Sequence, residues 1–426
     1  MNTLIKNAIV ADRHIFKGDI LIQDGRITAL GEHLPTPVGA KVIDAAGATV
    51  MPGLVDVHVH FREPGFTAKE TIRTGAAAAA HGGFTTVCAM PNLNPVPDNV
   101  ATLSQLVAKN RSDAAIHVQQ FAAITKGLKS TDLLDYAAMH QAGALGFSND
   151  GVGVQDAATM YQAMKGAAAV DAPIVAHIED AGLANHGVIN QGPKAKALGL
   201  PGINHVSESA QLARDLTLAE ATGVHYHACH VSTKQSVELI RDAKARGVHV
   251  TAEATPHHLL LDDGHIPGDD PMFKMNPPLR SEADRLALMD GLRDGTIDMI
   301  ATDHAPHTAA EKSGSFLTAA FGIVGLETAF ALLYTSFVRS GWCSLKDLIG
   351  WMSTKPADAF GLSAGRISIG APADLTIMDL DTAYQIDPTA FLSLGHNTPF
   401  AGRTVYGSVL WTLVDGDVAY QKEDKA

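Results

Sequence analysis

The middle of the chain alternates between short apolar segments and longer amphipathic ones. Eight of the apolar segments have the length and composition of buried β-strands: Leu54–His60, Phe84–Ala89, Ile116–Phe121, Ala144–Phe147, Pro173–His177, His225–His230, Val248–Ala254 and Asp298–Thr302. Helical patterns fill the intervals, for example at 68–83, 131–143, 156–169, 207–223, 233–247 and 281–295, and several of them end in glycine. Alternating strands and helices build parallel sheets, so eight such units predict an α/β fold with a (β/α)8 barrel.

Both ends of the chain have a different character from the middle. Residues 1–51 and 366–426 are rich in short apolar segments separated by turns, and each end carries an Asp-Gly hairpin signal, at Asp24-Gly25 and Asp415-Gly416. We therefore expect the two ends to form one small β-sandwich domain, with residues 52–365 as the barrel.

Composition narrows the class of protein. Hydrophobic residues make up 46% of the chain and charged residues 18%, which is typical of a soluble enzyme with a large core. The net charge of −13 argues against nucleic-acid binding, and no apolar run is long enough to cross a membrane. The N-terminus lacks the pattern of a secretory signal, and three scattered cysteines do not make a disulfide framework. These features favour a cytoplasmic location.

Metal-binding side chains lie at the ends of several predicted strands, where a barrel displays its functional groups. His58 and His60 point to the same face of the first strand because side chains alternate along a strand. Taken alone, this pair fits hydrogen-bonded core histidines as well as a metal site. Other strand ends add Asp150, His177, His230 and Asp303. Six such groups suit Zn²⁺ or a similar cation and exceed what one tetrahedral ion needs, so we expect two metals that share a carboxylate.

Two of these segments also resemble a known family. "DVHVHFREPG" and "ATDHAPH" are similar to the signature segments of the dihydroorotases, which belong to the amidohydrolase superfamily. The likeness continues through "MPNLNP", "NPPLR", "FGIVGLET" and the split β-domain, and it is closest to the longer, bacterial type I branch. It implies a metal-dependent cyclic amidohydrolase that reversibly interconverts N-carbamoyl-L-aspartate and L-dihydroorotate in pyrimidine biosynthesis.

The resemblance also implies a role for each ligand. His58, His60 and Asp303 correspond to ligands of the first metal, and His177 and His230 to ligands of the second. Many superfamily members bridge their metals with a carboxylated lysine, whereas this chain has Asp150 at that position, as the type I branch commonly does. Zn²⁺ is the expected metal, although Co²⁺ and Mn²⁺ suit the same ligands.

Asp303 is the expected catalytic residue. A metal-bound hydroxide would attack the ring carbonyl while Asp303 carries the proton to the leaving nitrogen. In the alternative, Asp303 is only a ligand.

Arg62 is expected to bind the substrate carboxylate with two parallel hydrogen bonds, the alternative being an ion pair with a neighbour such as Glu63. The resemblance assigns further substrate contacts to His60, Asn92, Asn276, His307 and the backbone of Phe321 and Gly322. Without it, Asn92 and Asn276 would be interpreted as turn residues beside prolines.

One loop, one histidine pair and one cysteine lie outside the expected ligand set. Residues 307–322 form a small-residue loop long enough to act as a lid. The pair His257 and His258 is not assigned as ligands, because the expected set of six is already complete. Cys229 points away from its neighbour His230 and is interpreted as core packing.

Two alternative functions stay open at this point. A hydantoinase or allantoinase would share the barrel and the histidines but usually carries the bridging lysine. A non-catalytic dihydroorotase-like partner of aspartate transcarbamoylase would have lost ligands that this chain retains. The resemblance further implies a homodimer, and it allows an association with aspartate transcarbamoylase.

Overall fold

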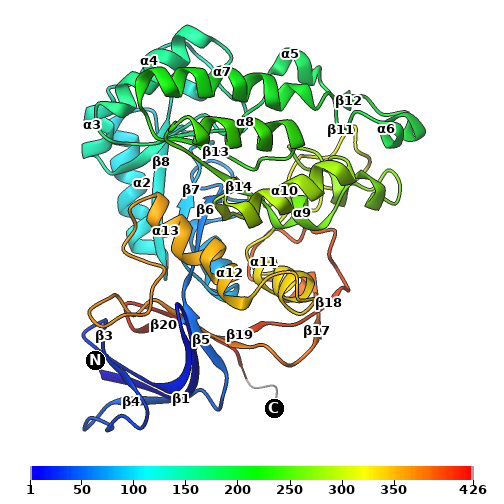
Figure 1. Ribbon diagram of the computed structural model, residues 1–426. Helices are drawn as coiled ribbons and strands as arrows, with labels where there is room; N and C mark the ends of the chain where they lie inside the picture. Colours follow the sequence, from blue (N-terminus) through cyan, green and yellow to red (C-terminus); the bar gives the residue numbers. More distant parts are fainter. Residues whose placement is uncertain (1, 424–426) are drawn as a thin grey trace.

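A ring of parallel strands forms the centre of the molecule in the computed structural model, which describes residues 2–423 (Figure 1). The strands lie in the order β6-β7-β8-β9-β10-β13-β14-β15. Their bounds are Leu54–Val59, Phe84–Ala89, His117–Ala123, Ala144–Ser148, Ile174–Ala176, Tyr226–Ala228, Val250–Ala254 and Met299–Ile300. A parallel bridge between Val59 and His304 closes the ring, and the His60 amide donates to the His304 carbonyl at 2.9 Å. The predicted (β/α)8 barrel is confirmed.

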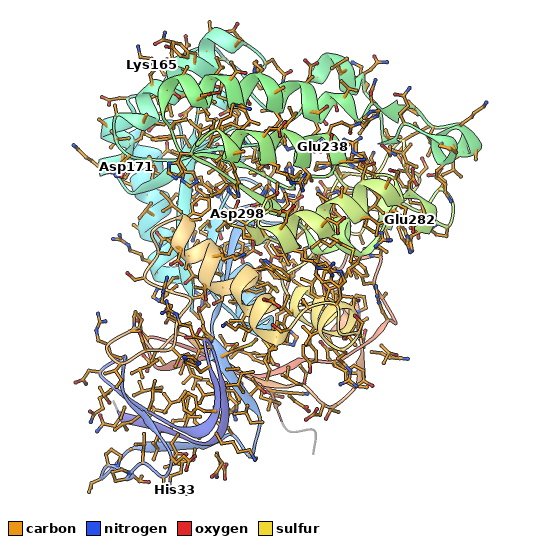
Figure 2. All side chains as sticks on the ribbon, viewed as in Figure 1. His33, Lys165, Asp171, Glu238, Glu282 and Asp298 are labelled. Carbon is orange, nitrogen blue, oxygen red and sulfur yellow. The ribbon has the colours of Figure 1, made fainter. Side chains whose placement is uncertain are left out.

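Helices surround this ring on its outer side. Those that overlap the predicted segments are α1 (Ile72–His81), α3 (Tyr136–Gln141), α4 (Ala157–Ala168), α7 (Val206–Thr222), α8 (Lys234–Ala245) and α10 (Glu282–Asp294). Their starts are set by side-chain caps such as Asp156, Thr233 and Ser281. Exposed charges such as Lys165 and Glu238, labelled on α4 and α8 in Figure 2, lie on the solvent side of these helices.

Several helices were not predicted. The longest is α2 (Val100–Asp113), whose buried side is limited to Leu103, Leu106 and Asn110 and therefore gives a weak periodic signal. The others are short: α5 (Ala181–Ala184), α6 (Pro193–Leu198), α9 (Pro256–Leu260), α11 (Ala329–Leu333), α12 (Leu345–Ile349) and α13 (Lys355–Ala359). No helix within residues 2–423 is both long enough and apolar enough to cross a membrane.

The two ends of the chain meet in a second sheet of eight strands. Its order is β20-β19-β16-β5-β1-β2-β3, and β4 also pairs with β1. From the N-terminal end come Asn2–Ala11, Ile15–Gln23, Arg26–Gly31, Lys41–Asp44 and Thr49–Pro52 (β1–β5), and from the C-terminal end come Leu375–Asp379, Ser408–Val414 and Asp417–Gln421 (β16, β19, β20). The antiparallel pair β5–β16 joins the two ends. The boundaries of the two domains stay a prediction.

One C-terminal segment leaves this sheet and returns to the barrel. The hairpin of β17 (Tyr384–Gln385) and β18 (Thr404–Val405) packs its Ile386, Phe400 and Val405 in one buried cluster with Phe316 and Ile323. Between these strands, the Asn397 side chain accepts from the His307 amide and donates to the Ala305 and Gly322 carbonyls. The C-terminal part of the chain therefore helps to fix loops at the barrel opening.

Candidate active site

The six predicted ligand residues lie together at the carboxyl ends of the barrel strands. His58 belongs to β6 and His60 follows it, while the others come directly after β9, β10, β13 and β15. All six are at least nine-tenths buried. Two of them, His230 and Asp303, have positive φ angles of 31° and 50°, which non-glycine residues adopt at a cost of about 1–3 kcal/mol. The fold thus holds these side chains in place against local backbone preference.

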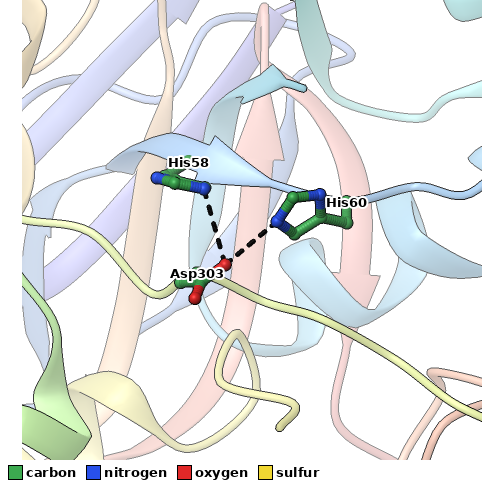
Figure 3. Close-up of side chains that lie close together, drawn as sticks. All are labelled: His58, His60 and Asp303. Atoms are coloured by element: carbon green, nitrogen blue, oxygen red, sulfur yellow. Dashed lines mark hydrogen bonds and ion pairs between the residues drawn. The ribbon is translucent and has the colours of Figure 1, made fainter. Parts of the chain in front are cut away.

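His58, His60 and Asp303 form the first half of the cluster. Figure 3 shows both imidazoles directed at one carboxylate oxygen, with Asp303 Oδ1 lying 3.4 Å from His58 Nε2 and 3.0 Å from His60 Nε2. Ligands about 2.0–2.2 Å from one tetrahedral ion lie about 3.3–3.6 Å apart, so this spacing fits a shared cation.

Asp150 lies between the two halves. Its Oδ2 is 3.5 Å from His60 Nε2, and its Oδ1 is 3.4 Å from His58 Nε2. The same Oδ1 lies 3.7 Å from His177 Nδ1 and 3.6 Å from His230 Nε2. One carboxylate therefore faces all four histidines, which is the geometry required of a bridging ligand.

The electrostatics of the cluster favour bound positive charge. Burial opposes ionisation of Asp150 and Asp303, but the facing histidines outweigh it, lowering the pKa of Asp303 to about 2 and that of Asp150 well below its usual value. Burial likewise opposes protonation of His58, yet Glu253, Asp150 and Asp303 raise its pKa well above the ordinary value. The same carboxylates favour a metal cation in place of that proton, because a histidine must be neutral to bind metal. Buried carboxylates held ionised in this way are suited to divalent cations.

Neighbouring side chains turn the histidine nitrogens toward the cluster. His58 Nδ1 donates to Glu253 at 2.6 Å and His60 Nδ1 donates to Asn92 Oδ1 at 2.9 Å, which leaves each Nε2 as a lone-pair donor. Within residues 2–423, the buried atoms His58 Nε2 and Asp150 Oδ1 have no hydrogen-bond partner. The cluster therefore fits metal ions, because a cation would satisfy both atoms.

Glu253 was not singled out in the sequence. It is fully buried in β14, and its carboxylate also accepts from His227 Nε2 at 2.9 Å and from the His230 amide at 3.0 Å. The sequence does carry a signal for Glu253, because it is an acidic residue inside an otherwise apolar strand and a buried charge needs a partner.

Arg62 lies beside the cluster, where Asp303 and Asp150 act on its charge. It is half-buried, and its Nε donates weakly to the Pro306 carbonyl at 3.4 Å. No carboxylate in the described part of the chain lies within ion-pair distance of it, whereas Glu63 pairs with Lys109 at 3.2 Å. The structure thus gives no support to the Arg62–Glu63 ion pair. Burial lowers the Arg62 pKa, although Asp303 and Asp150 act in the opposite direction.

The residues predicted to contact the substrate occupy the same end of the barrel. Asn92 joins two ligands, since its Nδ2 also lies 3.4 Å from Asp150 Oδ2. His307 Nε2 donates to the Phe321 carbonyl at 2.8 Å. Gly322 has a φ of 123°, and a Cβ there would lie 2.6 Å from that of Ala305, so only glycine fits.

The histidine pair that was not assigned to metal lies in α9. His258 Nε2 donates to the Pro277 carbonyl at 2.9 Å, and its Nδ1 lies 2.7 Å from the Thr255 hydroxyl. His258 therefore holds the loop that carries Asn276. Cys229 is fully buried among Val57, Cys88 and Val175, in agreement with a packing role.

Comparison with known proteins places the chain in one family. A family model described as dihydro-orotase-like matches residues 47–236. A protein of Lactiplantibacillus plantarum named dihydroorotase is 60% identical, with 100% of each chain covered. A protein of the same name from Enterococcus faecalis is 57% identical over 99% of this chain and 100% of its own.

Solved structures agree on the architecture. An L-hydantoinase from Arthrobacter aurescens superposes with a TM-score of 0.89 at 27% identity, covering 99% of this chain and 96% of its own. A D-hydantoinase from Thermus sp. gives 0.86 at 29% identity, covering 98% and 95%. The relatives named dihydroorotase are about twice as similar in sequence as these hydantoinases. By its sequence and its barrel, the chain belongs to the dihydroorotase family of metal-dependent cyclic amidohydrolases.

Proposed function

We propose that this protein is a dihydroorotase that reversibly interconverts L-dihydroorotate and N-carbamoyl-L-aspartate in pyrimidine biosynthesis. The observation that carries the proposal is Arg62, a half-buried cation beside the six-residue cluster that has no carboxylate partner among residues 2–423. A substrate with its own carboxylate supplies that partner, whereas the uncharged ring of a hydantoin or of dihydrouracil does not.

Six residues would hold two divalent cations, for which Zn²⁺ is the first candidate. His58, His60 and Asp303 would bind one, His177 and His230 the other, and Asp150 both. The imidazole and carboxylate donors, and the unpartnered buried atoms His58 Nε2 and Asp150 Oδ1, support this assignment. When bound, such cations polarise the ring amide carbonyl and lower the pKa of water.

Asp303 is proposed as the general acid and base. In hydrolysis its carboxylate accepts a proton from the attacking water and passes it to the ring nitrogen as the carbon–nitrogen bond breaks. In ring closure it accepts the proton from the carbamoyl nitrogen and returns it to the departing oxygen. The role rests on position, because the Asp303 carboxylate lies 3.0 Å from His60 Nε2 and 3.4 Å from His58 Nε2, inside the proposed metal cluster.

The surrounding residues are proposed to orient the ring. Arg62 grips the carboxylate through two N–H groups, while Asn276, His307 and the Phe321–Gly322 backbone border the ring. The Gly322 amide donates to the Lys274 carbonyl at 3.0 Å and its carbonyl accepts from Asn397, so the protein itself fixes the backbone at this position.

A substrate comparison tests the function. Purified protein of measured metal content should hydrolyse dihydroorotate far faster than dihydrouracil or hydantoin. A preference for either uncharged ring would overturn the substrate assignment and favour the hydantoinase alternative. Protein purified without chelators that binds no metal would favour the non-catalytic alternative.

We further propose a cytoplasmic homodimer that contacts neither membranes nor nucleic acid. The net charge of −13 supports the absence of nucleic-acid binding, and the free cysteines support the cytoplasmic location. The homodimer rests on the family resemblance alone. Light scattering during size-exclusion chromatography measures the oligomeric state, and addition of aspartate transcarbamoylase in the same experiment tests for association.

A further inference from the structure

An unassigned acidic residue, Glu179, lies against one of the proposed substrate contacts. It follows His177 by two positions after β10, whereas Asn276 lies in the loop before α10. Asn276 Nδ2 donates to Glu179 Oε2 at 3.0 Å. The contact therefore joins two loops that are far apart in the sequence.

This contact fixes the orientation of the Asn276 amide. An ionised carboxylate accepts hydrogen bonds but cannot donate them, so the amide must present its NH2 group to Glu179. The opposite edge, Oδ1, is then directed elsewhere. Oδ1 is buried and has no hydrogen-bond partner among the residues that the structure describes. A buried acceptor without a donor is costly, and it indicates a partner that the protein itself does not supply.

Both sides of the contact are held in place. The Glu179 carbonyl accepts from Gln155 Nε2 at 2.9 Å, and His258 holds the residue after Asn276 through the Pro277 carbonyl. Rotation of the amide would point Asn276 Oδ1 at the Glu179 carboxylate and break the hydrogen bond. Oδ1 is therefore a fixed acceptor.

The chemistry of the proposed substrate matches such an acceptor. Arg62 offers donors for the carboxylate, and the cluster would attract carbonyl oxygens. The ring N–H groups of dihydroorotate are donors and need an acceptor. We propose that Glu179 is a positioning residue that orients the Asn276 amide so that its Oδ1 accepts a hydrogen bond from a substrate N–H. The inference rests on the proposed function and assigns no catalytic role to Glu179.

The first test is the variant E179Q, which keeps the size of the side chain but lets it donate as well as accept. The amide at 276 can then reverse. We expect the KM for dihydroorotate to rise about tenfold, which corresponds to the loss of about one hydrogen bond. The kcat should change less than threefold, and the metal content should not change. The matched control is E238Q, a change at an exposed residue of α8, which should leave KM unaltered.

A charge exchange separates positioning from general structural support. In N276D two carboxylates face each other, and KM should rise at least as much as in E179Q. In the double variant E179Q/N276D, the new amide donates to one carboxylate oxygen and leaves the other as the acceptor, so KM should return to within about threefold of wild type. If the double variant loses as much binding free energy as the two single variants together, the proposal would be overturned.

The substrate N–H supplies an independent readout. In wild type, the inhibition constant of a ring N-methylated dihydroorotate should be higher than the KM for dihydroorotate, and this difference should shrink in E179Q. If wild type is active, and E179Q keeps both its KM and the difference between the methylated and unmethylated compounds, the role of Glu179 alone would be overturned. A wild type without dihydroorotate turnover would overturn the proposed function together with this inference.

Discussion

Replacement of Arg62 by methionine should remove the preference for a carboxylate-bearing substrate. The guanidinium is half-buried, and within residues 2–423 its one hydrogen bond is a long one, to the Pro306 carbonyl at 3.4 Å, so most of its donors are available to a ligand. Two charge-assisted hydrogen bonds contribute about 1.5–3 kcal/mol each. A loss of about 4 kcal/mol corresponds to a fall of about 10³-fold in kcat/KM.

The assay compares ligands as well as rates. The kcat/KM for dihydroorotate should fall by about this factor in R62M, with both metals retained. Wild type should bind N-carbamoyl-L-aspartate more tightly than N-carbamoyl-β-alanine, which lacks the second carboxylate, and R62M should bind the two equally. R246M, a change at an exposed arginine, is the control. A loss below tenfold, or an unchanged preference in R62M, would refute the role of Arg62.

Three other predictions concern the metal cluster and its surroundings. D303N should lower kcat by at least about 10³-fold while the metal at His177 and His230 is retained, as measured by turnover and metal analysis; near-normal turnover would contradict the acid–base role. E253Q should weaken metal affinity about 10–100-fold, because Glu253 orients His58, and a competitive chelator titration with unchanged affinity would contradict this. The buried His258 has a pKa lowered by burial to about 4, so the unfolded chain binds the extra proton as pH falls from 6.5 to 4. Denaturant titrations at the two pH values should therefore show a loss of stability that is about 3 kcal/mol smaller in H258Q than in wild type.

The barrel could be predicted because eight short, mostly apolar segments alternate with helical ones, as expected for parallel strands covered on both faces. The six ligands followed from the rule that barrel strands display functional groups at their carboxyl ends, and the structure brings all six together. Helix α2 was not predicted, because its few buried positions give little periodicity.

The supporting contacts could not be predicted because they join distant parts of the chain. Glu253 reaches His58 across 195 positions and Asn397 reaches His307 across 90. Neither side chain has a local motif that names its partner. The same holds for Glu179 and Asn276, whose sequence neighbours suggest only a turn and a strand end. Such pairs become visible only when the fold places their loops side by side.

Buried carboxylates and histidines are proposed to bind the cations that drive hydrolysis of an acidic ring. The most direct test is dihydroorotate hydrolysis by protein whose metal content is quantified before and after chelation. Turnover should fall as bound metal is removed and should return when Zn²⁺ is restored. Turnover that persists in metal-free protein, or metal-loaded protein that does not hydrolyse dihydroorotate, would contradict this proposal.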